Sequence, residues 1–486
     1  MDFDFSSPPP QAKTLEEAQA IINALWSICR QMKQQINQLE SRVKTLEERL
    51  NQNSQNSSKP PSSDGLQKPS PKSLRGKSGK NRGGQPGHQR NILEKHPHPD
   101  KIIYHALSIC EDCEKSLQDV ELIDYETRQI FDLPPLKIEI TEHRAEQKIC
   151  PCCYKTNTAK FPDDVAQPTQ YGSTIKGLSI YLNQYQFLPY KRLQEFFEDI
   201  FGHTISQGML VKINYQCYIN LEKSDLEIKR QLRISENLHH DESGIRVNGK
   251  LHWCHVASTR HLTNYGIHAK RGKEGINAMG ILPSFHGRLI HDFFTPYFSY
   301  GSQHALCNAH HLRELKFIEE ACHQEWAKHM ANLLLAIKNQ VEWHKENSAT
   351  LSLIRIQAYE RCYDEIIMQG LWHPDNIPKP KRDLKRGGYA KQTKAKNLLD
   401  RLRFHKEKAL AFMYDPAVNF TNNQAEQDIR MLKVKQKISG CFRSYEGAQW
   451  FARIKSYIST AKKQGQNVLD VLKNSFNGHA YMPQHG

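Results

Sequence analysis

The stretch Leu238–Ser258 constrains the fold more than any other part of the chain, because it contains a strong β-hairpin signal. Its central dipeptide Asn248-Gly249 suits a two-residue type I′ turn, and apolar side chains flank this turn on both sides. Two antiparallel strands are therefore predicted at the start of a sheet. Asp241 lies on or just before the first of them, so its carboxylate has a defined place in that sheet.

Two further carboxylates also occur where the local structure can be predicted. Arg288–Asp292 indicates a short buried strand that ends in a carboxylate, and Asn422–Arg430, which contains Glu426, is typical of the opening of a helix. Two strand carboxylates and one helix carboxylate could bind Mg²⁺ or Mn²⁺, because these hard cations prefer oxygen ligands. A pair of such ions stabilises an in-line displacement at phosphate, which is the chemistry of cutting and joining DNA strands.

Each of these carboxylates also has a purely structural interpretation. Asp241 could be a strand-edge or turn aspartate, and Asp292 could cap the next helix. Glu426 could be the N3 member of a capping box that begins at Asn423. Single residues leave these alternatives open, so the remaining motifs of the chain bear on the choice.

The charge of the chain favours a polyanionic partner. Among its 486 residues, 67 Lys and Arg stand against 52 Asp and Glu, which gives a formal charge of +15 and makes nucleic acid the leading candidate. The sequence has no long apolar run and no signal-peptide pattern, which predicts a soluble cytoplasmic protein, associated with the nucleoid and not with a membrane. Its 12 cysteines are then expected as thiols or metal ligands rather than as disulfides.

Four of these cysteines form two CxxC pairs, Cys110 with Cys113 and Cys150 with Cys153. Two such pairs supply four thiolates, which suit structural Zn²⁺ in a tetrahedral site. The interval between the pairs is longer than in compact zinc fingers, so strands within it, including Lys137–Thr141, are expected to bring the pairs together. A redox pair is the alternative, but no thioredoxin-like βαβ pattern surrounds these cysteines.

The N-terminal segment has the pattern of a coiled coil. Apolar residues fill two seam positions of a heptad repeat from Leu15 to Leu50, which predicts a coiled coil over residues 14–52 and a homodimer or higher oligomer. An amphipathic helix packed on the chain's own core is the alternative. Residues 53–95 are polar, basic and rich in Pro, Gly and Ser, which predicts a flexible linker that can lie along phosphates or merely increase solubility.

Residues 166–233 are predicted to be helical. Within them, Leu193–Ile213 is similar to a helix, a turn containing glycine and a second helix that Ser206 would cap. A helix-turn-helix could place its second helix in the major groove of DNA. Two packed helices without a DNA contact would have the same pattern.

A second metal site is also conceivable. Cys307 with His310 and His311, and likewise His239 with His240, are residue types that ligate transition metals. No further ligand stands at a diagnostic spacing from either group. We therefore interpret these side chains as hydrogen-bonding neighbours of the core and of the active site.

Basic side chains provide candidate contacts to DNA. From Phe317 to Tyr414 the chain is predicted to be helical, with an apolar stripe from Trp326 to Val341, and the run Pro378–Lys408 is strongly basic. We interpret that run as part of a helical insertion over bound DNA, although it could be only a solvated face. Five further candidates lie near the hairpin or along the helix of Glu426: Lys270, Arg271, Arg430, Lys433 and Lys435.

Together these motifs resemble a bacterial insertion-sequence transposase with a DDE active site, in the insertion sequence sixty-six family. The likeness includes the heptads, the paired cysteines and several short motifs spread along nearly the whole chain. These motifs are Ser57–Asp64, Gly83–His88, His240-Asp241-Glu242, Ala305–His310 and Asn422–Arg430. Ser243 and Asp292-Phe293 depart from the pattern, because many relatives have Thr and Asp-Gly at these places.

The resemblance implies a multidomain α/β protein with an RNase H-like catalytic core at 234–316 and 415–475. An all-helical insertion at 317–414 would interrupt this core. A zinc-binding β-rich module is then expected at 96–165, the helix-turn-helix-like region at 166–233, and a tail at 476–486. Asp241, Asp292 and Glu426 would be the magnesium ligands of the catalytic site.

The implied mechanism begins when a metal-activated water cuts at the end of the element, and the freed 3′ hydroxyl then attacks target DNA. The implied partners are the element ends, the target DNA and small accessory proteins from the same element. A zinc-containing DNA-binding regulator and a catalytically inactive, domesticated relative are the alternatives. A recombinase with a covalent Ser or Tyr intermediate is a more distant one.

Overall fold

The computed structural model describes residues 11–50, 52, 92–377 and 392–484. The motifs Ser57–Asp64 and Gly83–His88, most of the predicted linker and part of the basic run Pro378–Lys408 lie outside these residues. The chain divides into two compact units. The smaller unit comprises residues 72–161 and 194–205, and the larger unit comprises the remainder.

The N-terminal segment forms one helix, α1 (Leu15–Leu50), as the heptad pattern predicts. Its large apolar seam side chains are exposed, from 39% for Leu25 to 89% for Leu15. The exposed seam leaves an apolar stripe that a second helix could cover.

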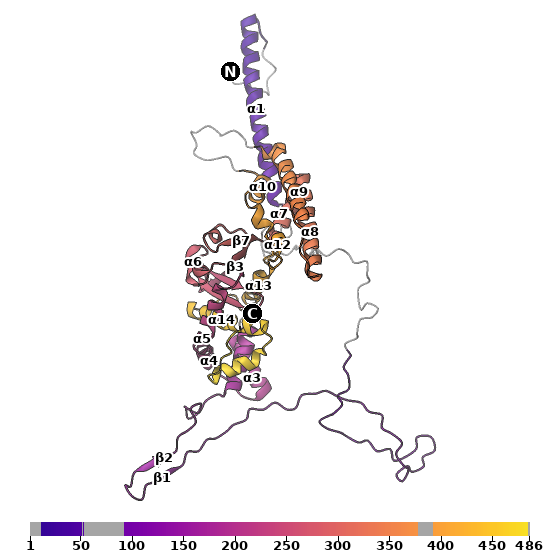
Figure 1. The fold of residues 1–486 in the computed structure, drawn as a ribbon, viewed down its shortest axis with the longest axis vertical. Coiled ribbons are helices and arrows are strands. Elements are labelled where there is room, and N and C mark those ends of the chain that lie inside the picture. Colours follow the sequence, from indigo (N-terminus) through magenta and orange to yellow (C-terminus); the bar gives the residue numbers. More distant parts are fainter. Residues whose placement is uncertain (1–10, 51, 53–91, 378–391, 485–486) are drawn as a thin grey trace. The chain divides into compact units, whose positions relative to one another are not determined.

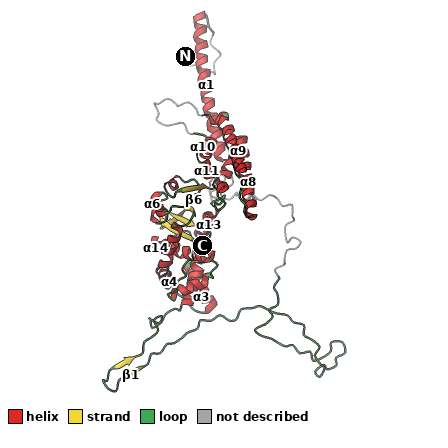
Figure 2. Cartoon of the chain, viewed as in Figure 1, coloured by secondary structure: helices red, strands yellow, loops and turns green. Residues whose placement is uncertain are grey.

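The smaller unit contains the two CxxC pairs and little regular secondary structure, as Figure 2 shows. Strands β1 (Gln147–Ile149) and β2 (Thr156–Thr158) pair antiparallel around Cys150 and Cys153. The strand predicted at Lys137–Thr141 is absent, and Ile140 there is 90% exposed. The expected β-rich character of this interval is therefore wrong for the described residues, because its apolar side chains have neither a partner strand nor a buried face.

Residues 173–233 form a helical segment within the region predicted to be helical, and residues 194–205 of this segment belong to the smaller unit. Ser206 caps α4, because its hydroxyl accepts a hydrogen bond from the Met209 backbone N–H at 3.2 Å. Within the larger unit, α4 packs through Ile213 and Cys217 against Ile454 and Ile458. The elements of the segment are α2 (Ser173–Ile180), η2 (Tyr181–Tyr185), α3 (Tyr190–Phe201), α4 (Gln207–Asn220) and α5 (Glu222–Arg233).

A five-stranded sheet with the order β5-β4-β3-β6-β7 follows. The predicted hairpin is confirmed: Val247 pairs with Lys250, and Asn248 and Gly249 have φ of 48° and 72°, as a type I′ turn requires. The first three strands are antiparallel, whereas β6 and β7 run parallel to β3. The strands are β3 (Asn237–Val247), β4 (Lys250–Ser258), β5 (Thr263–His268), β6 (Arg288–His291) and β7 (Gln303–Leu306).

Helices cover both faces of this sheet. On one face, Ile245 and Val247 of β3 pack with residues of α13 (Asn423–Ser439) and α14 (Tyr445–Lys463). On the other face, Leu238 packs with residues of α5, α6 (Lys273–Ala278), η3 (Leu282–Ser284) and η4 (Thr295–Ser299). Because side chains alternate along a strand, neighbouring residues of β3 belong to different layers.

A group of helices separates β7 from α13 in the sequence, where the helical insertion is predicted (Figure 1). Its core includes the predicted stripe, with Trp326, Met330, Ile337 and Val341 buried and Leu333 partly buried. None of the helices in the described ranges has the length and apolar character that crossing a membrane requires. The remaining elements are α7 (Asn308–Cys322), α8 (Glu325–Glu346), α9 (Leu353–Trp372), η5 (Pro374–Asn376), α10 (Lys394–Phe404), α11 (Lys406–Ala409), α12 (Ala411–Tyr414) and α15 (Val468–Phe476).

Candidate active site

Asp241 and Asp292 lie level with each other on neighbouring parallel strands. The register of β3 and β6 puts His239 opposite Ile290, and continuing it by two residues puts Asp241 opposite Asp292, which directly follows β6. By alternation, Asp241 belongs to the face of β3 that Ile245 presents to α13. Asp241 is therefore neither an edge nor a turn residue, because it lies within the central strand of the sheet.

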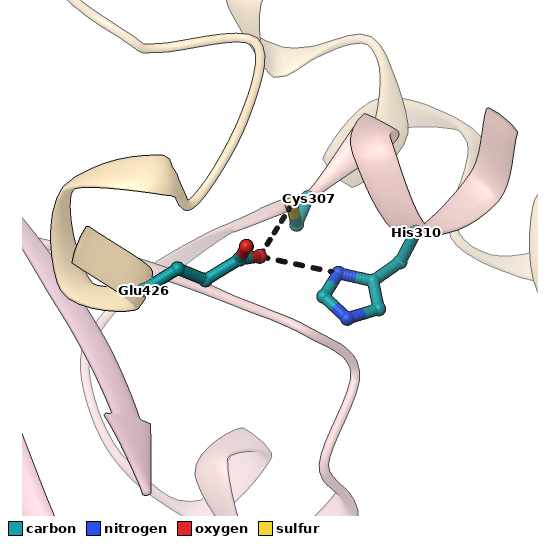
Figure 3. A group of neighbouring side chains, drawn as sticks. All are labelled: Cys307, His310 and Glu426. Atoms are coloured by element: carbon teal, nitrogen blue, oxygen red, sulfur yellow. Dashed lines mark hydrogen bonds and ion pairs between the residues drawn. The ribbon is translucent and has the colours of Figure 1, made fainter. Parts of the chain in front are cut away.

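Glu426 reaches this face from the first turn of α13. Asn422 fastens the start of the helix to β3, since its amide donates to the His240 carbonyl and its Oδ1 contacts His239 Nδ1, both at 2.9 Å. The structural alternative for Glu426, a capping box that begins at Asn423, is not formed, because Asn422 is the N-cap residue and makes no side-chain cap hydrogen bond. The Glu426 carboxylate instead faces Cys307 and His310 (Figure 3).

Burial and the neighbouring carboxylates affect the charge of Asp241. Burial raises the pKa of Asp241 well above its usual range, and the negative charges of Asp292, Glu242 and Glu426 raise it further. Burial also raises the pKa of Asp292. All three predicted ligands keep partial solvent exposure. The three side chains therefore offer accessible carboxylate oxygens whose negative charges repel one another. Such a group of ligands suits a hard divalent cation.

Asp292 has a structural role in addition. Its Oδ1 accepts a hydrogen bond from the Phe294 backbone N–H at 3.2 Å, so it does cap the turn that follows β6. Phe293 has a φ of 75°, in the left-handed region that favours glycine, and its ring lies 5.2 Å from that of Phe298 and 5.0 Å from that of His405. Phe293 therefore stands where many relatives have glycine, and glycine would adopt this positive φ without strain.

Glu242 is turned to the opposite face and anchors a cation. Its side chain is 1% exposed and accepts hydrogen bonds from the Tyr297 hydroxyl and from Arg271, whose Nε lies at 2.8 Å and Nη2 at 2.7 Å. The Arg271 guanidinium also lies 4.2 Å from the centre of the Phe294 ring and 5.0 Å from that of Trp253. Its charge lowers the pKa of Asp292, which partly offsets the effect of burial.

Replacing Arg271 is therefore expected to destabilise the fold. Arg271→Ala leaves the buried Glu242 carboxylate without its cation, and because the Arg271 side chain is 44% accessible the expected cost is about 1–3 kcal/mol of unfolding free energy. Urea unfolding of the full chain measures the loss, and the exposed neighbour Lys270 provides the control Lys270→Ala. Adding Glu242→Gln should restore part of the stability. Equal stability of Arg271→Ala and wild type would contradict this account.

Two of the basic side chains that were candidate DNA contacts have partners inside the fold. Lys433 Nζ donates to the Gly244 carbonyl at 2.6 Å. Lys435 Nζ lies 5.0 Å from the centre of the Phe451 ring, and burial lowers its pKa to about 8. Lys270 and Arg430 are exposed. Sequence spacing could not separate these two groups, because it does not show which lysines the core encloses.

Ion pairs also involve part of the basic run Pro378–Lys408. In its described portion, three cations have carboxylate partners, whereas Arg403 is exposed. The pairs are Lys396 with Asp400, Arg401 with Glu314, and Lys406 with Asp364. For these three side chains the structure favours a role in the insertion itself.

The two CxxC pairs in the smaller unit form the same kind of turn. The backbone N–H of Cys110 donates to the Lys115 carbonyl at 2.9 Å, and that of Cys150 donates to the Lys155 carbonyl at 3.0 Å. The residue after each pair has a positive φ, 56° at Glu114 and 53° at Tyr154. Hydrogen bonds from following backbone N–H groups lower the pKa of Cys110 and of Cys150, which favours the thiolate that binds zinc.

The structure does not gather these four cysteines into one group. Among the described residues, the His, Cys, Asp and Glu side chains whose ligand atoms lie within 4.8 Å of one another are Cys307, His310 and Glu426. The sequence near Cys307 and His310 has no further ligand at a diagnostic spacing. Glu426 supplies it from a distant helix, and no spacing rule could have found it.

Three family profiles match parts of the chain. The profile described as "Transposase IS66 family" matches residues 168–450, and the profile described as "zinc-finger binding domain of transposase IS66" matches residues 108–154. A family of unknown function, DUF6444, matches residues 7–94. No curated protein matches the chain. Because the first profile spans more than half of its length, the chain belongs to the IS66 family of transposases.

Proposed function

We propose that this transposase binds the ends of an insertion sequence and catalyses metal-dependent DNA strand cleavage and strand transfer at Asp241, Asp292 and Glu426. The observation that carries the proposal is the level placement of Asp241 and Asp292 on parallel strands, on the face where Glu426 adds a third carboxylate. Membership of the family supports the same reaction class.

The sheet and its covering helices are proposed to be the RNase H-like core that the resemblance implies. Three consecutive antiparallel strands continue into two strands parallel to the first, with helices on both faces. The insertion then lies between the second and third carboxylates in the sequence, because α8 to α12 precede α13.

Asp241, Asp292 and Glu426 would hold Mg²⁺ or Mn²⁺, and their oxygen-only, mutually repulsive donor set fits such an ion. When bound, the ion would stabilise negative charge on the reacting phosphate and lower the pKa of the water or 3′ hydroxyl that attacks it. The protein orients the set rigidly: β3 and β6 fix the two aspartates, and Asn422 ties α13 to β3. Arg271 adds a fixed positive charge beside Asp292.

DNA is proposed to follow the exposed basic side chains near these carboxylates. Lys270 and Arg430 are exposed, and Arg271 keeps 44% of its side chain accessible. Helix α4 is a weaker candidate, because Lys212 is its only basic residue and Val211, Tyr215 and Ile219 are among its exposed side chains. The zinc-finger domain of the smaller unit supplies a further DNA contact, with Cys110, Cys113, Cys150 and Cys153 as the proposed zinc ligands.

Self-association is proposed to occur through α1. The full chain should then have at least twice its mass of 56.3 kDa in solution. Leu39→Lys places a charge in the exposed apolar seam and should shift the protein to the monomer, as sedimentation or light scattering would measure. Gln38→Lys, on the same helix but off the seam, is the matched control. A monomeric wild type would refute this assembly.

The proposed activity is tested with wild-type protein and labelled DNA that carries the genomic repeats flanking the element. We expect new 3′ hydroxyl ends and joined products with Mg²⁺ or Mn²⁺, and neither with EDTA. Small proteins encoded by the same element should be added in a parallel reaction. Binding without cutting in every reaction would instead identify a DNA-binding regulator or an inactive, domesticated relative.

A further inference from the structure

A compact ligand group lies directly beside the proposed catalytic carboxylates. The register of β6 and β7 puts His291 opposite Leu306, so the next residues, Asp292 and Cys307, are level. Cys307 is also the N-cap of α7, which presents His310 one turn later. Figure 3 shows how the side chains of Cys307, His310 and Glu426 converge from α7 and α13.

The distances within the group are close to those of a metal site. Glu426 Oε1 lies 3.9 Å from Cys307 Sγ and 3.7 Å from His310 Nδ1. One ligand atom of each residue lies within 4.8 Å of the other two, so an ion midway among them would be at most about 2.8 Å from each. Zinc distances of about 2.0–2.3 Å are therefore reached by movements of less than about 1 Å.

The surroundings of the ligand atoms also favour a metal. His310 Nδ1 is buried and has no hydrogen-bond partner in the described part of the chain, although it points towards Glu426. The backbone N–H of Asn422 donates to Cys307 Sγ at 3.1 Å, so the sulfur is held facing Glu426 and His310. Burial and the negative charge of Glu426 raise the pKa of the Cys307 thiol in the metal-free protein, so a bound cation would have to offset both effects when it displaces the thiol proton.

We propose that Cys307, His310 and Glu426 form a second metal site that binds a thiophilic divalent ion such as Zn²⁺. Its mixed sulfur, nitrogen and oxygen ligands select a transition metal over Mg²⁺. Glu426 belongs to both sites, so zinc would hold its carboxylate away from the magnesium site and inhibit strand cleavage. This inhibition rests on the proposed function, whereas zinc binding does not.

The binding half of the proposal is tested by zinc titration of the full chain against a chromophoric chelator. Wild type should bind one zinc ion more than Cys307→Ser or His310→Gln, whereas Cys441→Ser, at an exposed cysteine, should match wild type. The double variant Cys110→Ser/Cys113→Ser should keep the additional ion, because it alters only the zinc-finger domain. Cobalt substitution should show one sulfur-to-metal charge-transfer contribution that Cys307→Ser removes.

Unfolding in EDTA separates a lost site from a lost fold. Cys307 is 1% exposed, so its substitution can affect packing, whereas His310 keeps 15% of its side chain accessible. His310→Gln with a wild-type unfolding midpoint and one zinc ion fewer supports the site. If Cys307→Ser and His310→Gln both bind as much zinc as wild type, the proposed site is wrong. Cys307 and Glu426 would then make only a contact between a thiol and a carboxylate.

The inhibitory half is tested by the ratio of cleavage rates with and without micromolar Zn²⁺, at constant Mg²⁺, within each variant. Zinc should lower this ratio at least about tenfold in wild type and leave it near one in His310→Gln. Equal inhibition of both proteins contradicts the shared role of Glu426. If wild type does not cleave without zinc, even with the small proteins of the same element added, the proposed function is refuted, whereas the zinc titration still decides the site.

Discussion

Asp241→Asn is expected to lower metal-dependent strand cleavage by about 10³-fold, because it removes one charged ligand from a centre that acts on a developing phosphate charge. The amide keeps the shape of the side chain, so DNA binding should remain. Cleavage of labelled element ends and a binding titration on the same DNA measure the two effects. Glu426→Gln should behave in the same way.

The control for this substitution is Asp470→Asn, which makes the same chemical change at an exposed position of α15. It should cleave at the wild-type rate. Full activity of Asp241→Asn would show that this carboxylate is structural and would remove the observation on which the proposed function rests.

The same variant should be more stable than wild type when metal is absent. The pKa of Asp241 is raised in the folded protein, so folding becomes less favourable as the pH rises above the carboxyl pKa of the unfolded chain. Asp241→Asn removes this cost, and its unfolding midpoint in EDTA should exceed that of wild type by a few degrees at pH 7. The difference should vanish at a pH below the unfolded pKa, and Mg²⁺ should stabilise wild type more than the variant.

Cys113→Ser and Cys153→Ser are each expected to weaken zinc binding by the smaller unit more than about 100-fold, because each removes a direct thiolate ligand. Structural zinc contributes about 10–16 kcal/mol to the folding of small modules. The smaller unit has many exposed apolar side chains, including Ile123 at 100% and Ile130 at 92%. Zinc should therefore protect wild type from proteolysis in residues 96–161, and this protection should be lost in both variants.

Cys152 provides a matched control, since it is an exposed cysteine in the same turn as Cys150 and Cys153. Cys152→Ser should retain zinc and protection from proteolysis. If all three substitutions leave zinc binding unchanged, the four proposed ligands are wrong. If Cys152→Ser alone abolishes it, the second turn binds zinc through a different cysteine.

Local signals were sufficient for most of the elements around the proposed active site. The Asn248-Gly249 turn, the strand before Asp292, the helix that begins near Glu426 and the Ser206 cap all appear where the sequence placed them. Each depends on residues within about one turn of the chain, such as the positive φ that glycine adopts freely. The strands expected between the CxxC pairs failed, because a strand depends on a partner that composition does not supply.

The sequence by itself determined the family, the heptad repeat of α1, the two CxxC pairs and the local setting of each proposed carboxylate. Only the tertiary structure decided which side chains meet. The parallel register brings Asp241, Asp292 and Cys307 level, and α13 adds Glu426 beside Cys307 and His310. The tertiary structure also decides that Lys433 and Lys435 contact partners inside the fold, which their spacing along the helix does not reveal. The physical reason is that residues distant in sequence approach one another only when strands pair and helices pack, and both depend on the whole core.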